Sequence, residues 1–201
     1  MHYATRAVVL VFNSAFRSWS VGTYISQDAL GLSGLKGCLI FWYPCYAYGY
    51  FYWKIYSMNC LLKLNLNTME FFTVDLPPDH NERRIIVVEA GEGRLGMFSH
   101  NNHDTFLNYY TSIQNEGQRA IEWQMKNIIP LPELNDPYIV GAPQGYIFVL
   151  GDPKVEDAVH TTCFSLDIRT SKIERVSQVS FSYFCGYPYL GFPPSMSPRR
   201  I

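Results

Sequence analysis

The sequence has little net charge and no clusters of charge of one sign. Its 16 Lys and Arg residues and 17 Asp and Glu residues give a formal net charge of −1 over 201 residues. Adjacent basic residues occur only at Arg83-Arg84 and Arg199-Arg200. Binding to nucleic acid or to an anionic membrane surface depends on concentrated positive charge. We therefore expect no nucleic-acid partner and no membrane partner.

The cysteines show no metal-binding or disulfide pattern. There are five, an odd number, and no two are spaced as C-x-x-C: Cys38, Cys45, Cys60, Cys163 and Cys185. This argues against a structural zinc site and a disulfide framework, and it suits a reducing compartment. The sequence also lacks a basic-then-apolar leader and any N-x-S/T acceptor. We expect an intracellular protein, cytoplasmic or nuclear.

The sequence also lacks an apolar run long enough for a membrane helix. The longest candidate, Cys38–Trp53, is shorter than the ~20 residues that a helix needs to cross a bilayer. Pro44 and Gly49 interrupt it. Within it, tyrosines recur with period two at Tyr46, Tyr48, Tyr50 and Tyr52. Because period two is typical of strands, the run predicts two adjacent buried strands around a turn at Pro44.

Aromatic residues and alternating patterns dominate what is present. Phe, Tyr and Trp make up 16% of the chain, which suits strands. No window of eleven residues shows a capped helical period. The sequence therefore predicts an all-β fold. The strands are expected at residues 7–12, 17–24, 38–43, 49–56, 61–66, 70–75, 85–89, 94–99, 107–113, 121–128, 138–141, 145–150, 162–168 and 172–179.

A hairpin unit repeats along the chain. Alternating strands flank a polar turn at residues 8–21, 62–72, 107–125 and 163–176, and larger units open at Gly49, Gly93 and Gly145. The spacings between these three glycines are typical of β-propeller blades, which run ~40–50 residues in WD40 and kelch proteins. We expect a partial, N-terminally truncated propeller-like array of about three to four blades over residues 1–191. A disordered Pro/Ser-rich tail is expected at 192–201.

Two local patterns resemble ligand sites. Gly91–Gly96 matches the dinucleotide pattern G-x-G-x-x-G, but a strand-like segment follows it where that chemistry needs a helix N-terminus. We interpret it as a hairpin turn. His100, His103 and Asp104 lie together in a predicted loop, without the fixed spacing of a helical metal-ligand pair. We interpret them as solvated loop residues and expect no metal site.

Catalytic and sugar-binding patterns are weak. No nucleophile-elbow or protease signature surrounds any Ser or Cys. The aromatic segment Trp42–Trp53 is a possible sugar-stacking face, although packing between blades explains alternate aromatics better for most of these residues. We favour packing, and we expect a protein that is not an enzyme and carries no cofactor.

Several strings resemble the F-box-associated domain of grass (rice-type) F-box proteins. The segment Val88–Phe98 is the most specific of them, and the resemblance runs from about Ala7 to the end of the chain. The other matching strings are Gly49–Lys54, Met69–Phe71, Val74–Pro78, Glu122–Gln124, Ile129–Pro132 and Phe192–Ser195. The resemblance implies a kelch-like, propeller-like region that selects the protein to be ubiquitinated by an SCF-type ubiquitin ligase.

This resemblance also defines the expected partners. In that plant family an F-box binds a Skp1-type adaptor, and no F-box string occurs here, so adaptor binding is expected only for a longer form that carries one. The expected partner of the chain itself is a protein substrate of unknown identity. Two alternatives stay open: a propeller-type carbohydrate-binding protein, and a fragment of a longer F-box protein without its own function.

Polar loops between strands are the expected contact regions, because binding residues concentrate on loops held by a rigid scaffold. The loops are Asp79–Arg84, Ser99–Thr105, Gln114–Arg119 and Asp152–His160. The candidate partner-binding residues are Asp79, His80, Arg83, Arg84, His100, His103, Asp104, Arg119 and Lys154.

Overall fold

The structure is a computed structural model that describes residues 6–31, 41, 44–101, 104–113, 121–143, 145–154 and 161–179. These residues form antiparallel strands and one short 3-10 helix, η1 (Asp28–Leu30), with no α-helix among them. The all-β prediction is confirmed. The strands are β1 (Arg6–Asn13), β2 (Ser18–Ser26), β3 (Cys45–Ala47), β4 (Tyr50–Lys54), β5 (Cys60–Asn65), β6 (Phe71–Asp75), β7 (Arg84–Glu89), β8 (Leu95–His100), β9 (Phe106–Ile113), β10 (Glu122–Pro130), β11 (Leu134–Gly141), β12 (Tyr146–Pro153), β13 (Thr161–Asp167) and β14 (Ile173–Val179).

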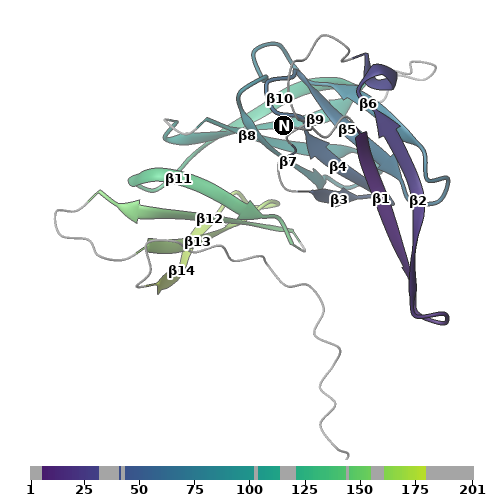
Figure 1. Ribbon diagram of the computed structural model, residues 1–201. Coiled ribbons are helices and arrows are strands. Elements are labelled where there is room, and N and C mark those ends of the chain that lie inside the picture. Colours follow the sequence, from purple (N-terminus) through teal and green to yellow (C-terminus); the bar gives the residue numbers. More distant parts are fainter. Residues whose placement is uncertain are drawn as a thin grey trace, which may run out of the picture. The chain divides into compact units, whose positions relative to one another are not determined.

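The strands pair in chain order (Figure 1). β1 and β2 form a two-stranded hairpin, and the remaining strands form three four-stranded sheets, β3–β6, β7–β10 and β11–β14. In each sheet every strand pairs with its neighbour in sequence, which is the meander pattern. No helix in the described part of the chain is long and apolar enough to span a membrane. The predicted tail at 192–201 and most of the predicted strand 38–43 lie outside the described residues.

The three glycines used to divide the sequence mark the same place in each sheet. Gly49, Gly93 and Gly145 lie in the turn between the first and second strand, with φ of 81°, 73° and 86°. Each unit therefore begins one strand before its glycine, and the prediction that the glycine opens the unit is corrected by one strand. The turn predicted at Pro44 is also wrong. β3 begins after this residue, and the turn lies at Tyr48-Gly49, where both φ values are positive, as two-residue hairpin turns require.

A second turn is repeated in detail. Asn65 at the end of β5 accepts backbone N–H bonds from the residues two and three positions on, at 2.9 and 3.3 Å, and Asp167 at the end of β13 does the same at 2.9 and 2.9 Å. Four residues beyond each lies a positive φ, at Met69 and Ser171. Asn13 in the β1–β2 hairpin accepts the same pair of bonds, at 3.0 and 3.2 Å. The sequence repeat is thus a repeat of turn chemistry.

The chain divides into two compact units, each with its own core. The first comprises residues 1–101 and 108–127, and its main core lies between sheet β3–β6 and sheet β7–β10. Its buried members are Ala47, Tyr52, Leu61, Val74, Leu76, Ile85, Val87, Leu95 and Met97. On the opposite face of β4 and β5, Ile55 and Leu62 pack against residues that include Ile25 of β2. Sheet β3–β6 is therefore covered on both faces, and its strands are correspondingly rich in apolar residues.

The second unit comprises residues 102–107 and 128–201, and contains sheet β11–β14. Its central strands carry the most buried side chains, with Ile147, Val149 and Leu150 on β12 and Leu166 on β13 each at most 2% exposed. Gly151 lies so close to Leu134 that a Cβ there would be 2.9 Å from the leucine Cβ. The close approach of β11 and β12 therefore needs glycine at this position.

Candidate protein-contact loop

A buried lysine lies where sheet β3–β6 meets the connection that leads to β7. Lys54 at the end of β4 is only 2% exposed, because period two places it on the same face as Tyr52 in the core. Its ammonium donates to the carbonyl oxygens of Ile55 at 2.7 Å and Asn81 at 2.9 Å, and also to that of Met58. Burial lowers the pKa of Lys54 to about 8. All three donors of the ammonium are thus directed at backbone carbonyls.

The acceptor on Asn81 belongs to the connection between β6 and β7, residues 76–83, which we call the anchored loop. Asn59 holds the same loop from the other side. Its side-chain amide donates to the carbonyls of Leu76 and Pro77, each at 2.8 Å, and its side-chain oxygen accepts the His80 N–H at 2.9 Å. Lys54 of β4 and Asn59 of the β4–β5 connection therefore fix the loop backbone at four points, at residues 76, 77, 80 and 81.

His80 completes the anchorage. It is 5% exposed, and its Nδ1 lies 2.8 Å from the Pro78 carbonyl, so that nitrogen carries the proton. Its ring stands edge-on to Tyr110 of β9, with the centroids 5.3 Å apart. Burial lowers the pKa of His80, and Nε2 is buried without a hydrogen-bond partner. The imidazole is therefore held neutral, as a packed component of the loop's inner side.

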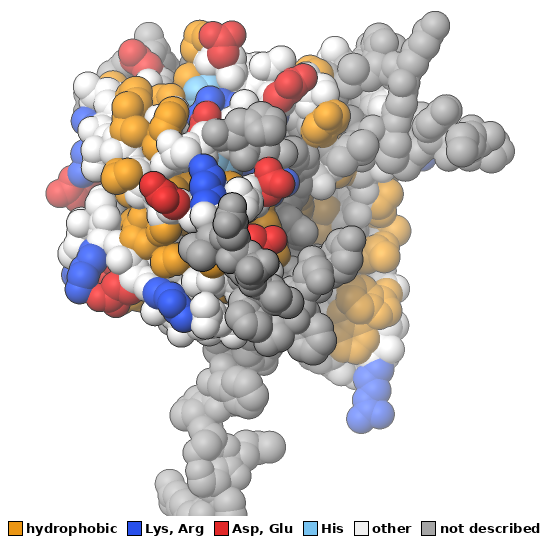
Figure 2. Space-filling view, turned by 90° about the vertical axis from the view of Figure 1, so that its left-hand side faces the viewer, with side chains coloured by type: hydrophobic (Ala, Val, Ile, Leu, Met, Phe, Trp, Pro, Cys, Tyr) orange, Lys and Arg blue, Asp and Glu red, His pale blue; other side chains and the backbone are white. Residues whose placement is uncertain are grey.

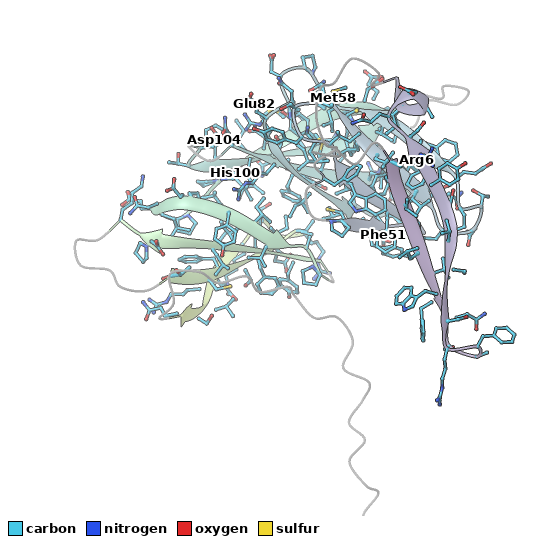
Figure 3. All side chains as sticks on the ribbon, in the orientation of Figure 1. Arg6, Phe51, Met58, Glu82, His100 and Asp104 are labelled. Carbon is cyan, nitrogen blue, oxygen red and sulfur yellow. The ribbon has the colours of Figure 1, made fainter. Side chains whose placement is uncertain are left out.

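The outer side of the anchored loop is exposed and acidic. Asp79, Asn81 and Glu82 are all solvent-exposed, and Asp79 has a φ of 63°. Figure 3 shows Glu82 near Met58, whose carbonyl shares the Lys54 ammonium with that of Asn81. The loop thus alternates between residues that hold it and residues that face solvent. The outer side of the anchored loop therefore presents two carboxylates, those of Asp79 and Glu82, to solvent.

The other candidate residues near this loop are partly or fully buried in or beside the sheet that follows it. Arg83 is half-buried, and its Nε donates to the Ser99 hydroxyl at 2.7 Å. Arg84 begins β7 and stands opposite His100 of β8, which is fully buried. Sequence reasoning placed His100 in a loop, and the structure places it at the end of a strand, where it offers no surface to a partner.

The remaining candidates are scattered or outside the described residues. Asp104 is half-buried. Lys154 is exposed and directly follows β12, and its backbone N–H donates to the Glu133 carbonyl at 3.3 Å. His103 and Arg119 lie outside the described residues, as do the predicted loop 114–119 and most of 152–160. In the part of the chain that the structure describes, no three His, Cys, Asp or Glu side chains are grouped to hold a metal ion.

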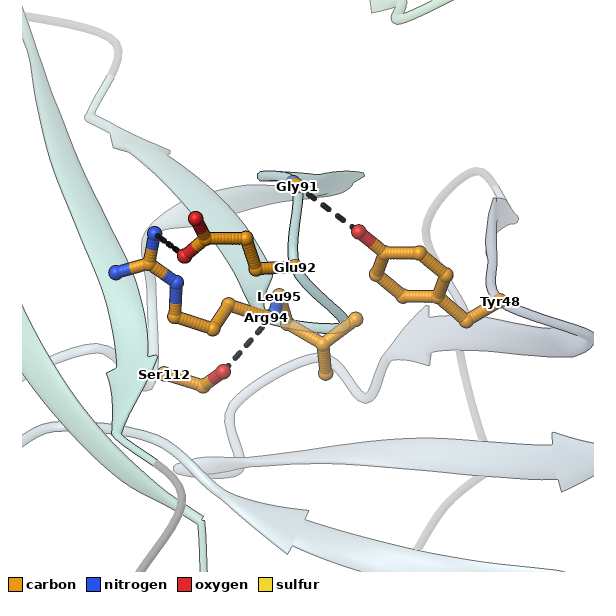
Figure 4. Close-up of polar contacts among 6 residues, drawn as sticks. All are labelled: Tyr48, Gly91, Glu92, Arg94, Leu95 and Ser112. Atoms are coloured by element: carbon orange, nitrogen blue, oxygen red, sulfur yellow. Dashed lines mark hydrogen bonds and ion pairs between the residues drawn. The ribbon is translucent and has the colours of Figure 1, made fainter.

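The G-x-G-x-x-G segment forms the turn between β7 and β8, as interpreted from the sequence. Gly91, Glu92 and Gly93 all have positive φ, and β8 begins at Leu95 where a nucleotide site would need a helix. The Gly91 N–H donates to the Tyr48 hydroxyl at 3.1 Å, and Arg94 pairs with Glu92 at 2.8 Å (Figure 4). The turn's backbone donor is thus used to join two neighbouring sheets.

The same sheets are joined at other points along this edge. The Tyr48 N–H donates to Glu89 Oε1 at 2.8 Å, and the Leu95 N–H donates to the Ser112 hydroxyl at 2.9 Å within the second sheet. The Trp123 indole of β10 donates to the Asp75 carbonyl of β6 at 2.9 Å. The bonds from Tyr48 to Glu89 and from Trp123 to Asp75 therefore join sheet β3–β6 to sheet β7–β10.

The aromatic segment is divided between the two faces of its sheet. Tyr50 and Tyr52 pack towards the core between the sheets, which agrees with the packing interpretation for these residues. Tyr46 is 57% exposed and makes an edge contact with Phe51 at 5.7 Å between ring centroids. Trp42 lies outside the described residues.

Sequence reasoning missed Lys54 and Asn59, which determine the shape of the anchored loop. The signal for Lys54 was available, since a charged residue in phase with Tyr50 and Tyr52 falls on a buried face. Asn59 carries no comparable signal, because asparagine between two strands is typical of any turn.

Comparison with known proteins adds no family name. No family model matches the chain, and no curated protein matches it.

Proposed function

We propose that the chain is a non-catalytic protein-interaction module, built as a partial array of propeller-like blades, that binds a protein through its anchored loop. The observation that carries the proposal is the anchorage itself. Lys54, Asn59 and His80 hold the inner side of the loop, while Asp79, Asn81 and Glu82 face solvent. A loop held in its bound conformation loses little conformational entropy on binding.

The propeller-like arrangement is supported by repetition. Three successive four-stranded meanders share a glycine at the first turn, and two share the Asn or Asp turn before the last strand. In the two sheets that share that turn, the residue after the Asn or Asp also donates to the carbonyl of the unit glycine, Leu66 to Gly49 at 3.2 Å and Ile168 to Gly145 at 2.9 Å. Blades of a propeller are repeated four-stranded meanders of this kind.

The charge of the loop indicates the chemistry of the partner. Asp79 and Glu82 are exposed carboxylates, and the nearby cations, Lys54 and Arg83, are directed towards the protein interior. Complementary charge at the rim of an interface selects the partner and increases the association rate. We expect the contacted segment of the partner to be basic.

The proposal follows the resemblance to grass F-box-associated domains, which implies a role in substrate recognition. In a longer form with an F-box, the adaptor would contact the F-box and the anchored loop would contact the protein to be ubiquitinated. The chain's own share of that function is recognition, and it needs no bound cofactor.

Affinity capture with matched charge reversals tests the proposal. The purified chain is immobilised and exposed to an extract of grass leaves, and each captured protein is then purified and its affinity measured directly. The double variant Asp79→Lys/Glu82→Lys reverses both loop carboxylates. The control, Glu92→Lys/Glu174→Lys, makes the same change in net charge at two exposed ion pairs, one in the β7–β8 turn and one in β14. Exposed ion pairs contribute little to stability.

We expect the loop variant to weaken binding by about tenfold or more and the control to leave it nearly unchanged. Added salt should weaken wild-type binding in the same direction. A partner that binds all three proteins equally would contradict the anchored loop as the contact site. If captured proteins bind only through their attached glycans, this would instead support the carbohydrate-binding alternative.

A further inference from the structure

The β1–β2 hairpin carries an apolar face that stays exposed beside the described residues of its own unit. The register pairs Val8 with Tyr24, Leu10 with Val21 and Phe12 with Trp19. Directly paired residues point to the same side of a hairpin, and alternate residues share a face. We call the set Val8, Leu10, Phe12, Trp19, Val21 and Tyr24 the hairpin face.

A bulge creates this continuous face. Val9 pairs with Thr23 and Leu10 with Val21, so Gly22 is an extra residue without a partner in β1. An extra residue shifts the alternation by one position. Without it, Ser20 would share a face with Tyr24, and Trp19 would point to the other side. The bulge therefore places Trp19, Val21 and Tyr24 on one side of the hairpin, and of the large apolar residues of β2 only Ile25 lies on the other.

The hairpin face is solvent-exposed along its whole length. Its six side chains are between 47% and 66% exposed. Phe12 and Trp19 contact each other at 5.1 Å between ring centroids, and the Arg6 guanidinium lies 5.6 Å from the Tyr24 ring centroid. Figure 2 shows hydrophobic side chains gathered along the hairpin at the right of that view.

The exposed area is of interface size. The three aromatic rings alone expose roughly 350 Å², taking about 200 Å² for an aromatic side chain. Three aliphatic side chains extend this surface over strands of eight and nine residues, a length of about 26 Å. The largest apolar patch on a typical monomer is roughly 300–600 Å², and a standard interface covers roughly 800 Å² per partner. The hairpin face with its edges reaches this range.

The strand edges and the charges of the hairpin are consistent with self-association. From Ala7 to Gln27 the only charged residue is Arg17, at the tip, and no lysine or proline interrupts either strand edge. Isolated two-stranded hairpins are marginally stable in water, and proteins normally protect long apolar edges with such residues. Homodimer interfaces are more apolar than other interfaces, and an uncharged face does not repel its own copy.

We propose that the hairpin face is the interface with a second copy of this chain, which packs face to face and antiparallel about a two-fold axis at the Leu10–Val21 pair. In this arrangement Phe12 and Trp19 of each copy contact Val8 and Tyr24 of the other. Arg17 at each tip then comes near the partner's hairpin base, where Arg6 and Asp28 carry opposite charges, so no net like charge opposes the contact.

Sedimentation velocity of the 201-residue chain over a range of micromolar concentrations tests the proposal. We expect a dimer of twice the 23.2 kDa chain mass. Leu10→Lys places a charge on the hairpin face and should raise the dissociation constant at least tenfold. Val11→Lys is the matched control, with the same charge on the adjacent residue of the same strand but on the opposite face, and should leave the dimer intact.

A second variant keeps the test independent of folding defects caused by a charge. Leu10→Cys lies at the proposed two-fold axis, so mild oxidation should join two copies into a covalent dimer, whereas Val11→Cys should not exceed the wild-type background. A monomeric wild-type protein, equal dissociation constants for the two lysine variants, open-ended polymers, or equal cross-linking of the two cysteine variants would each overturn the proposal.

Discussion

Replacing Lys54 by methionine tests how far a single ammonium holds the anchored loop. Methionine keeps an unbranched stem of similar length, so the packing against Tyr52 changes little, while the three N–H donors are lost. The carbonyls of Ile55, Met58 and Asn81 then have no side-chain donor. The substitution therefore separates the polar contribution of Lys54 from its contribution to the core.

Two opposing effects set the magnitude. Hydrogen bonds to a charged group contribute about 1.5–3 kcal/mol each, so three of them contribute roughly 4–9 kcal/mol. Against this, removing the ammonium from water is costly, as the lowering of the Lys54 pKa from 10.5 to about 8 by burial indicates. The lost bonds outweigh the relief, and we expect a net destabilisation of about 3 kcal/mol.

Urea unfolding followed by far-UV circular dichroism measures the change, with Lys63→Met as the control. Lys63 is a half-buried lysine on the neighbouring strand β5, and its ammonium lies 3.8 Å from the Tyr50 ring centroid. Its loss removes a cation–π contact of about 1 kcal/mol and no carbonyl cap. Because the chain has two compact units, the comparison uses the transition that the variants shift.

The reasoning would be refuted if Lys54→Met were as stable as the wild type, or no less stable than Lys63→Met. Either result would mean that water replaces the ammonium at the three carbonyls without loss. The anchored loop would then be held by Asn59 and by packing of His80, and its rigidity would need another cause.

Two further predictions concern buried groups of the same unit. Since the folded-state pKa of His80 is lowered below 6.5, its stabilising contribution is complete above pH 6.5 and is lost as the pH falls below that value. Between pH 7 and 5 the wild type should therefore lose more stability than His80→Asn, which keeps a donor for Pro78. Parallel pH dependences of the urea midpoints would contradict this. Gly96→Ala should lower the free energy of unfolding by about 1–3 kcal/mol, because the new Cβ would lie 2.8 Å from Val88 Cγ2 and 3.2 Å from the Tyr109 ring. Thermal unfolding measures this change, and an unchanged midpoint would show that β8 shifts to make room for the methyl group.

Local chemistry made most of the strands predictable. The Asn or Asp that ends one strand and accepts two backbone bonds from the next turn is readable in the sequence at Asn13, Asn65 and Asp167. Alternation on either side of it then defines a hairpin without any long-range information. The turn at Tyr48-Gly49 was placed wrongly because Pro44 is the stronger local signal, although the backbone needs two positive φ values and proline cannot supply one.

The candidate site was less predictable because its contacts are long-range. Asn81 receives its bond from Lys54, 27 residues earlier, and the ring of His80 contacts Tyr110, 30 residues later. A histidine between two prolines and an arginine pair reads as an exposed loop residue in the sequence, and only the packing of two sheets shows that it is buried. The sequence predicted a loop at Asp79–Arg84 and did not distinguish its inner from its outer side.

The hairpin face shows the reverse case, a long-range property with a local cause. Large apolar residues occur in β2 at Trp19, Val21 and Tyr24, and the break in alternation between the last two contains Gly22. Glycine in a strand indicates a bulge or a close approach, and here both apply, since a Cβ would lie 2.5 Å from Met69 Cε and 2.8 Å from Val11 Cγ2. One small residue therefore selects which side of the hairpin is apolar. A bulky residue at this position would conflict with Met69 and with Val11.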